Sequence, residues 1–227
     1  MKIEKITIVI KKFFDLYDEL LSYILPKEEN TIFIENMTEE YIMREITQAN
    51  QTSNNNFKAL FQYKNKIFKK AIWEIKYHAN KKIIQKFSKL FYEFIINEIS
   101  DEISFSNFNN PLLIPVPISK NNLKERGFNQ SELITKEIKK LDIDNFFELS
   151  LNSIFKIRNT PHQSKLKNRT KRLKNLKGCF YANKEIVKNK NIIIIDDVIT
   201  TGATMTEISK TLKEAGAKKV IGFAIGH

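Results

Sequence analysis

Cysteine is nearly absent from the sequence, and so is any long apolar run. The single Cys179 excludes an internal disulfide bond and a zinc site built from cysteines, and it fits a reducing compartment. A membrane-spanning helix needs about 20 mostly apolar residues, and no stretch reaches that length. The apolar run of residues 6–10 is followed at once by Lys11 and Lys12, unlike a secretory signal. We therefore expect a soluble, cytoplasmic protein.

Glycine is also scarce and unevenly placed. The sequence has 6 glycines, and all of them lie at or after Gly127. Glycine is the residue that permits tight turns and phosphate-binding loops. The first half should therefore be mostly helical, and the functional loops should fall in the second half.

Acidic residues are outnumbered by basic ones. The chain of 227 residues has 38 Lys and Arg against 26 Asp and Glu, a formal net charge of +12. Such a charge fits a phosphate-rich partner. However, Lys, Asn and Ile are abundant throughout, so much of the lysine reflects a bias of the whole sequence. An apolar fraction of 42% is ample for a core.

Helical patterns fill the start of the chain. Apolar residues spaced by three and four predict a helix over residues 13–24, which Pro26 ends. Thr38 is a suitable N-cap for a second helix, over residues 38–49. The polar residues 51–56 are typical of a linker.

The remainder of the chain has the pattern of an α/β domain. Two amphipathic helices are predicted over residues 66–77 and 81–99. A strand over residues 112–115, a proline-containing turn and a helix that starts near Gln130 make one α/β unit. A last strand is predicted over residues 219–225. We therefore predict a helical N-terminal extension, residues 1–57, and an α/β domain, residues 58–227.

One stretch of the second half combines a strand, two acids and a small-residue loop. Residues 191–195 form an apolar, β-branched run, which is typical of a strand buried on both faces. Asp196 and Asp197 follow directly, then a loop of small residues over 200–204, then a helical pattern over 206–215. In open α/β sheets, ligands bind beyond the carboxyl ends of the strands. We therefore expect this stretch to line a binding site.

The chemistry of this stretch suits a sugar phosphate. The N–H groups of a loop made of Thr, Gly and Ala can approach an anion, and the dipole of the following helix adds to the attraction. The hydroxyls of Thr200, Thr201 and Thr204 can donate further bonds, and ionised Asp196 and Asp197 can accept bonds from sugar hydroxyls. An ordinary turn with two solvated acids is the alternative. It gives no reason for two acids to repel each other at the end of a buried strand.

A basic segment precedes this stretch. Phe155 to Arg158 can form the end of a strand, and no acid occurs between Lys156 and Gly178. Long cationic segments of this kind are typical of lids or of disordered loops. A solvated basic face is the alternative, and charge alone does not decide between them.

The strand, acids and loop resemble the phosphoribosyl pyrophosphate signature of the type I phosphoribosyltransferases. The resemblance implies an α/β fold with a parallel sheet flanked by helices. It also implies that the loop holds the 5′-phosphate of the donor, phosphoribosyl pyrophosphate, while the acids hold the ribose 2′- and 3′-hydroxyls. The substrate-binding residues implied by the signature are Asp196, Asp197, Thr200, Thr201, Gly202, Ala203 and Thr204.

Other segments are similar to the ComF family, phosphoribosyltransferase-like proteins that are linked to competence for DNA uptake. These segments are Val116-Pro117-Ile118-Ser119, Arg126-Gly127-Phe128-Asn129-Gln130, the set Thr160, Gln163, Leu166, Arg169 and Arg172, and the segment from Tyr63 to Tyr77 that ends in Ile75-Lys76-Tyr77. The family commonly begins with a Cys-rich zinc module. Since no cysteine precedes Cys179, we expect that module to be absent or replaced by residues 1–57.

This resemblance assigns a pyrophosphate-binding turn. Val116, Pro117, Ile118 and Ser119 take the place of the family's pyrophosphate loop, in which backbone N–H groups and the Ser119 hydroxyl would donate hydrogen bonds. Arg126 either assists this turn or is a packing or surface arginine. The sequence leaves both roles open.

The resemblance also implies a catalytic loop and a cofactor. The basic segment takes the place of the family's flexible loop, and its candidate catalytic residues are Gln163, Lys165 and Arg169. Mg²⁺ is implied as an ion that arrives with the donor, keeps its waters and sits near Asp196 and Asp197. No protein ligand of the metal is certain from the sequence.

Two hypotheses from different classes follow. The first is an enzyme that binds phosphoribosyl pyrophosphate with Mg²⁺ and transfers the phosphoribosyl group to an acceptor that the sequence does not identify. The second is a non-catalytic DNA-uptake protein that binds nucleic acid, including single-stranded DNA, through its basic segment. Aromatic residues that stack single strands are missing there, which favours the first. Because superfamily members often dimerise, a homodimer is a further expectation.

Overall fold

The structure is a computed structural model that divides into two compact units, residues 1–36 and 37–227. The residues that it describes are 28–49, 56–158 and 175–227. In the first unit, the described part consists mainly of helix α2 (Glu29–Asn36). All other elements belong to the second unit.

Several predictions fall mainly or wholly outside the described residues. They are the helix over 13–24, the linker over 51–56, and the basic segment with its candidates Gln163, Lys165 and Arg169. These stay predictions. So does the division of the chain into residues 1–57 and 58–227.

The second unit is built on a five-stranded sheet in which all neighbouring strands run parallel. In spatial order the strands are β1 (Phe57–Phe61), β7 (Lys219–Gly226), β6 (Asn191–Val198), β2 (Leu112–Pro115) and β3 (Glu148–Leu149). The isoleucine-rich β6 is the central strand, as a run buried on both faces requires. The predicted α/β class with a parallel sheet is confirmed.

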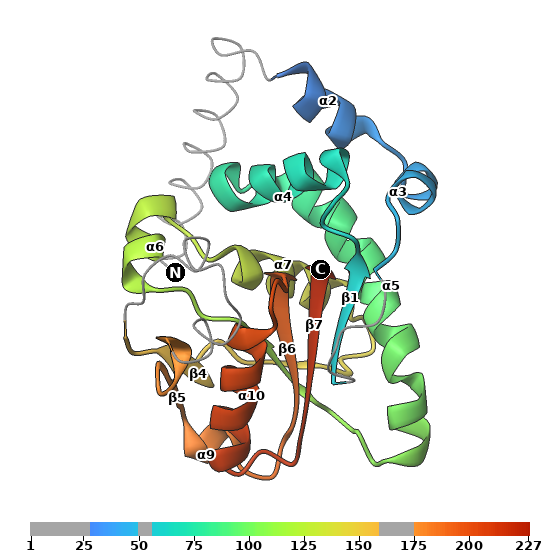
Figure 1. Ribbon diagram of the computed structural model, residues 1–227. Helices are drawn as coiled ribbons and strands as arrows, with labels where there is room; N and C mark the ends of the chain where they lie inside the picture. Colours follow the sequence, from blue (N-terminus) through green and yellow to red (C-terminus); the bar gives the residue numbers. More distant parts are fainter. Residues whose placement is uncertain (1–27, 50–55, 159–174) are drawn as a thin grey trace, which may run out of the picture. The chain divides into compact units, whose positions relative to one another are not determined.

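Helices cover both faces of this sheet (Figure 1). Helix α10 (Ala203–Glu214) lies on one face, and helices α5 (Lys81–Phe105) and α7 (Gln130–Leu141) lie on the other. Ile192 and Ile194 of β6 belong to the hydrophobic cluster that includes α10. Because successive side chains of a strand point to opposite faces, the isoleucines between and after them point to the other layer.

Shorter elements complete the second unit. They are α3 (Glu39–Glu45), α4 (Lys66–His78), α6 (Lys120–Arg126), α9 (Lys184–Val187), and the antiparallel pair of β4 (Ile154–Lys156) and β5 (Phe180–Ala182). Helix α4 lies beyond the carboxyl ends of the parallel strands (Figure 1). Within the described ranges, no helix has the length and apolar character needed to cross a bilayer.

Helix α4 packs closely against the carboxyl end of β7. A Cβ atom on Gly226 would lie 2.5 Å from Cε1 of Phe68 on α4, so a side chain at this position would force Phe68 or the strand to shift. Phe68 is fully buried and packs against Phe61 and Phe87. The contact fixes α4 over the edge of the sheet where ligands of α/β proteins bind.

Most of the elements predicted for this unit are confirmed. The strand that precedes the proline-containing turn stops at Pro115, and a helix starts at Gln130. The helices predicted over 66–77 and 81–99 are α4 and α5, of which α5 continues to Phe105. Strand β1 was not predicted.

Two predicted helix boundaries are wrong. The helix over 38–49 ends at Glu45, because the chain then runs extended beside β1 and the Ala49 N–H donates to the Leu60 carbonyl at 2.9 Å. The helix after the small-residue loop starts at Ala203, about one turn earlier than predicted. Pairing with β1 sets the first boundary. The left-handed conformation of Gly202, the residue before Ala203, sets the second.

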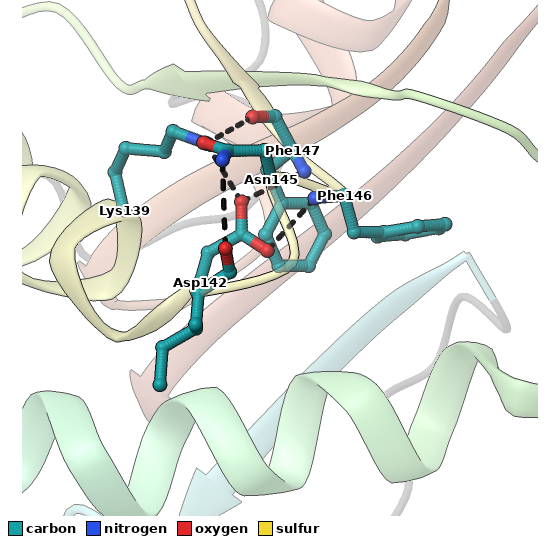
Figure 2. A network of polar contacts seen from close by, with 6 residues as sticks. Lys139, Asp142, Asn145, Phe146 and Phe147 are labelled. Atoms are coloured by element: carbon teal, nitrogen blue, oxygen red, sulfur yellow. Dashed lines mark hydrogen bonds and ion pairs between the residues drawn. The ribbon is translucent and has the colours of Figure 1, made fainter.

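A buried carboxylate holds the turn after α7 (Figure 2). The carboxylate of Asp142 accepts hydrogen bonds from the N–H groups of Phe146 and Phe147, both at 2.9 Å. Lys139 Nζ lies 2.8 Å from Asp142 Oδ2 and also donates to Asn145 Oδ1 and to the Phe147 carbonyl. This network fixes the path of the chain from α7 into β3.

Candidate functional site

The two acids near the end of β6 are both buried. Asp196 is 9% exposed and Asp197 is 4% exposed, so each carboxylate depends on partners within the protein. Asp196 Oδ1 accepts hydrogen bonds from Ser131 Oγ and from the Asp197 N–H, both at 2.9 Å. Because Ser131 lies in the first turn of α7, that helix fixes the orientation of Asp196.

Asp197 is held from two sides. Its Oδ2 lies 2.7 Å from Lys76 Nζ in an ion pair, and its Oδ1 accepts a hydrogen bond of 3.2 Å from Gln130 Nε2. Lys76 belongs to the last turn of α4, and Gln130 is the first residue of α7. Two helices from distant parts of the chain therefore converge on one side chain.

These surroundings move the pKa values of the two acids in opposite directions. Burial, and then the charge of Asp197, raise the pKa of Asp196 well above its usual range. Burial also acts to raise the pKa of Asp197, but the neighbouring Lys76 ammonium and the hydrogen bonds to the carboxylate outweigh it, so this pKa is lowered. The same ion pair raises the pKa of Lys76 against the effect of burial. Asp197 is thus the acid that keeps its negative charge more firmly.

Arg126 reaches the acids through one intermediary. Its Nη1 donates to Gln130 Oε1 at 3.0 Å, and Gln130 donates in turn to Asp197. Its guanidinium carbon lies 5.3 Å from the centre of the Tyr77 ring, within the range of a cation–π contact. Its Nε is buried and has no hydrogen-bond partner among the described residues. Arg126 therefore orients Gln130, and its Nε–H group is still without a hydrogen-bond partner among the described residues.

The predicted pyrophosphate turn, residues 116–119, is fixed by its neighbours. The Val116 N–H donates to the Ile195 carbonyl at 2.8 Å, and the Val116 carbonyl accepts from Asn129 Nδ2 at 3.0 Å. Ser119 is buried and caps α6, since its Oγ accepts from a backbone N–H of the first turn at 3.2 Å. The sequence did not predict this capping role. Binding of pyrophosphate by the turn stays a prediction.

The small-residue loop ends at a helix N-terminus without a side-chain cap. Gly202 is the N-cap of α10 with φ at 72°, in the left-handed region, and offers no side chain. By contrast, the N-cap side chains of α3, α4, α5, α6, α7 and α9 each accept a hydrogen bond. Thr201 Oγ1 is buried and has no hydrogen-bond partner in the described part of the chain. An open helix N-terminus beside an unpaired hydroxyl is suited to bind an anion.

The acid pair supplies two carboxylates of the kind that bind Mg²⁺. The described residues contain no group of three or more His, Cys, Asp or Glu side chains that could cage a metal ion. Mg²⁺ keeps several waters and is commonly held through one or two carboxylates together with substrate phosphates. Asp196 and Asp197 fit an ion of this kind that arrives with a substrate.

The structure brings most of the predicted residues together and adds others. Asp196, Asp197 and the loop that starts α10 follow one another at the carboxyl edge, and Arg126 joins them through Gln130. The residues that sequence reasoning did not assign to the site are Lys76, Asn129, Gln130 and Ser131. A signal existed for the last three, because they are consecutive polar residues at the start of an amphipathic helix. Lys76 stands in Ile75-Lys76-Tyr77, a segment similar to the ComF family, but the sequence did not link it to the acids.

A comparison with known protein families matches one part of the chain. Residues 136–225 match the family described as phosphoribosyl transferase domain. Together with the parallel sheet and the acid pair that leads into α10, this match defines a type I phosphoribosyltransferase-like α/β domain.

Several curated proteins with related names are similar to part of the chain. Competence protein F of Haemophilus influenzae is 36% identical over 112 residues, which cover 48% of this chain and 46% of that protein. The two proteins named Competence protein ComFC, of Bacillus subtilis and Streptococcus pneumoniae, are 35% identical over 116 residues (50% of this chain and 43% of that protein) and 30% identical over 137 residues (60% and 54%). The chain is similar to these competence proteins over the matched residues. It spans about half the length of the curated relatives that it matches.

Proposed function

We propose that this chain binds phosphoribosyl pyrophosphate with Mg²⁺ at the carboxyl edge of its sheet and transfers the phosphoribosyl group to an acceptor. In the proposed complex, the loop of Thr200, Thr201, Gly202, Ala203 and Thr204 holds the 5′-phosphate. Asp196 and Asp197 accept hydrogen bonds from the ribose hydroxyls. The acceptor is not identified by these residues.

One observation carries the proposal. The uncapped N-terminus of α10, with the unpaired Thr201 hydroxyl beside it, comes directly after a pair of buried carboxylates. A helix N-terminus attracts an anion, whereas carboxylates repel one and accept hydroxyl donors instead. A ligand that satisfies both carries an anionic group and neighbouring hydroxyls, and a ribose phosphate has both.

The proposed transfer exchanges one bond at the anomeric carbon. The bond from this carbon to the pyrophosphate oxygen breaks, pyrophosphate leaves with the electron pair, and a bond to the nucleophile of the acceptor forms. Donors near the leaving group would lower the barrier by stabilising the charge that develops on it. When bound with the donor, Mg²⁺ would supply part of that charge neutralisation.

Residues of two segments are proposed to hold the leaving group. The turn of Val116, Pro117, Ile118 and Ser119 lies at the carboxyl end of β2, next to β6 in the sheet. Arg126 offers its unused Nε in the same region. Gln163, Lys165 and Arg169 of the basic segment are proposed to close over the pyrophosphate.

A second function is proposed as the alternative. The relatives carry the names Competence protein and DNA utilization protein, and the chain has a net charge of +12. Both support a non-catalytic role in DNA uptake, in which the basic residues 156–177 bind single-stranded DNA. A cytoplasmic location and a homodimer remain predictions alongside either function.

Calorimetric titration with phosphoribosyl pyrophosphate and Mg²⁺ separates the two functions. We expect Asp197→Asn to weaken donor binding by about tenfold to a hundredfold, the value of one or two hydrogen bonds to a charged group. The matched control is Asp144→Asn, which changes an exposed acid in the turn after α7 and should bind the donor like the wild type.

A second titration uses a single-stranded oligonucleotide at two salt concentrations. Oligonucleotide binding that falls steeply with salt, in a protein that does not bind the donor, would support the alternative and contradict the first proposal. Donor binding that Asp197→Asn leaves unchanged would contradict the assignment of the acids.

A further inference from the structure

Lys76 supplies a positive charge to the acid pair from a separate element. Its ammonium group lies 2.7 Å from Asp197 Oδ2, and its side chain is 23% exposed while that of Asp197 is 5% exposed. The pair joins α4, which lies beyond the carboxyl edge, to the central strand of the sheet (Figure 1). The acid concerned is one of the two that the proposed function assigns to the ribose and its metal ion.

Each oxygen of Asp197 faces a partner, although Oδ2 accepts no hydrogen bond from a described residue. Oδ1 accepts from Gln130 and Oδ2 pairs with Lys76. A carboxylate oxygen has more than one lone-pair site, so a metal ion can reach Oδ2, but there it lies close to the Lys76 ammonium. A divalent cation and an ammonium group also repel each other when they share one oxygen.

Of the two partners, Lys76 is the one that is free to leave. Gln130 is 5% exposed, stands at the start of α7 and is fixed by its hydrogen bond from Arg126. Lys76 is more exposed, and its ammonium sits on a flexible four-carbon stem. Displacing it requires rotation of one side chain, whereas displacing Gln130 would disturb the start of a packed helix.

We propose that Lys76 is the resident cation of the donor-free site and that a divalent metal ion competes with it for Asp197. The lysine keeps the buried acid pair compensated while the site is empty of donor, and it withdraws when the metal ion arrives. This inference rests on the proposed function for the identity of the ion, and it makes α4 responsive to donor binding.

The test compares Lys76→Met, Lys76→Arg and a matched control, Lys70→Met. Lys70 stands on the same helix and pairs with the buried Glu74 at 3.2 Å. Calorimetry with Mg²⁺ alone measures metal affinity, and thermal unfolding with and without Mg²⁺ measures its effect on stability. Neither readout depends on catalytic activity.

We expect Lys76→Met to bind Mg²⁺ at least tenfold more tightly than the wild type. Without metal its Tm should fall, and Mg²⁺ should raise that Tm by more than it raises the Tm of the wild type. Lys76→Arg and Lys70→Met should bind the metal like the wild type. Equal or weaker binding of Mg²⁺ by Lys76→Met, including no binding by either protein, would overturn the proposal.

A measurement on the wild-type protein covers the case in which Lys76→Met does not fold. Labelling of lysine amines, read by mass spectrometry, should show that Lys76 reacts faster once Mg²⁺ and phosphoribosyl pyrophosphate are present. Unchanged labelling at saturation would overturn the proposal. Mg²⁺ binding that tightens in Lys76→Met, with no binding of phosphoribosyl pyrophosphate by any variant or by the wild type, would contradict the proposed function. It would still support competition between Lys76 and the metal ion for Asp197.

Discussion

Gly202 is the residue at which the small-residue loop turns into α10. Its φ of 72° is in the left-handed region, and a Cβ there would meet only Cδ2 of Phe57, at 4.0 Å. We therefore expect Gly202→Ala to lower the free energy of unfolding by about 1–2 kcal/mol through backbone strain rather than through a clash. The added methyl group should also obstruct an anion at the helix N-terminus. Urea unfolding and donor calorimetry measure the two effects.

The opposite end of α10 offers a matched control for that substitution. Gly216 also has a left-handed φ, 97°, and lies just beyond the C-terminus of the helix. Gly216→Ala should lose stability for the same backbone reason but bind phosphoribosyl pyrophosphate normally. Equal loss of donor binding in both variants would mean that instability, not the geometry of the loop, explains the effect of Gly202→Ala.

Asp196 gives a prediction for pH. Burial and the charge of Asp197 raise its pKa in the folded state, so its contribution to stability is full below the unfolded pKa and is lost as pH rises through the folded pKa. Asp196→Asn removes this loss and keeps an oxygen for the Ser131 hydroxyl. We expect the variant to be more stable than the wild type at neutral pH, by a margin that shrinks towards acid pH.

Asp197 should behave in the opposite sense. Its folded pKa is lowered, so its contribution to stability is present above the unfolded pKa and disappears as pH falls through the folded pKa.

Urea unfolding of Asp196→Asn and of the wild type over a series of pH values measures the difference in stability that is predicted for Asp196→Asn. A variant that is less stable than the wild type at every pH would contradict the account of the acid pair.

At the scale of single residues, the sequence predicted the acids and the loop but not their partners. Adjacent acids after a buried strand are conspicuous, because solvation and repulsion both oppose them. Lys76 is one lysine among many in a lysine-rich chain, and only the fold brings it to Asp197. Likewise, the sequence did not predict that the Ser119 oxygen accepts a capping bond in α6, while the role of its hydroxyl hydrogen toward a ligand stays a prediction.

At the scale of elements, helix α7 has a hydrogen-bond network at each of its ends. Its first turn holds the acid pair through Gln130 and Ser131, and its C-terminus is followed by the Asp142 network (Figure 2). The networks at the two ends therefore have different structural roles. The first holds the candidate site, and the second fixes the connection to β3.

Asp142→Ala tests the structural end. It would leave the buried N–H groups of Phe146 and Phe147 without an acceptor and Lys139 without its carboxylate. Since removal of one partner of a buried ion pair costs about 3–5 kcal/mol, we expect a loss of about 3 kcal/mol in the free energy of unfolding. Urea unfolding measures it. A loss below about 1 kcal/mol, the range of a surface ion pair, would contradict the role given to this network.

Elements with strong apolar patterns were mostly predictable, but α6 and β1 were not predicted. Helix α6 has no buried residue, so it lacks an apolar stripe and depends on its Ser119 cap. Strand β1 is a five-residue strand at the sheet edge, and pairing with β7 gives it its place. A local cap therefore supports α6, whereas a tertiary contact, the pairing with β7, places β1.

At the scale of the whole molecule, the parallel sheet explains why separate segments form one site. The carboxyl ends of β2 and β6 lie side by side, so the turn after one and the loop after the other share an edge. Helix α4 closes over the same edge. This arrangement followed from the sequence once the α/β pattern was recognised, whereas the acceptor did not, because no residue pattern specifies it.

The most direct test of the account is a crystal structure of the wild-type protein with phosphoribosyl pyrophosphate and Mg²⁺. The account predicts the 5′-phosphate at the N-terminus of α10, with the ribose hydroxyls on Asp196 and Asp197. A donor bound elsewhere on the chain, or a ribose turned away from both acids, would contradict it.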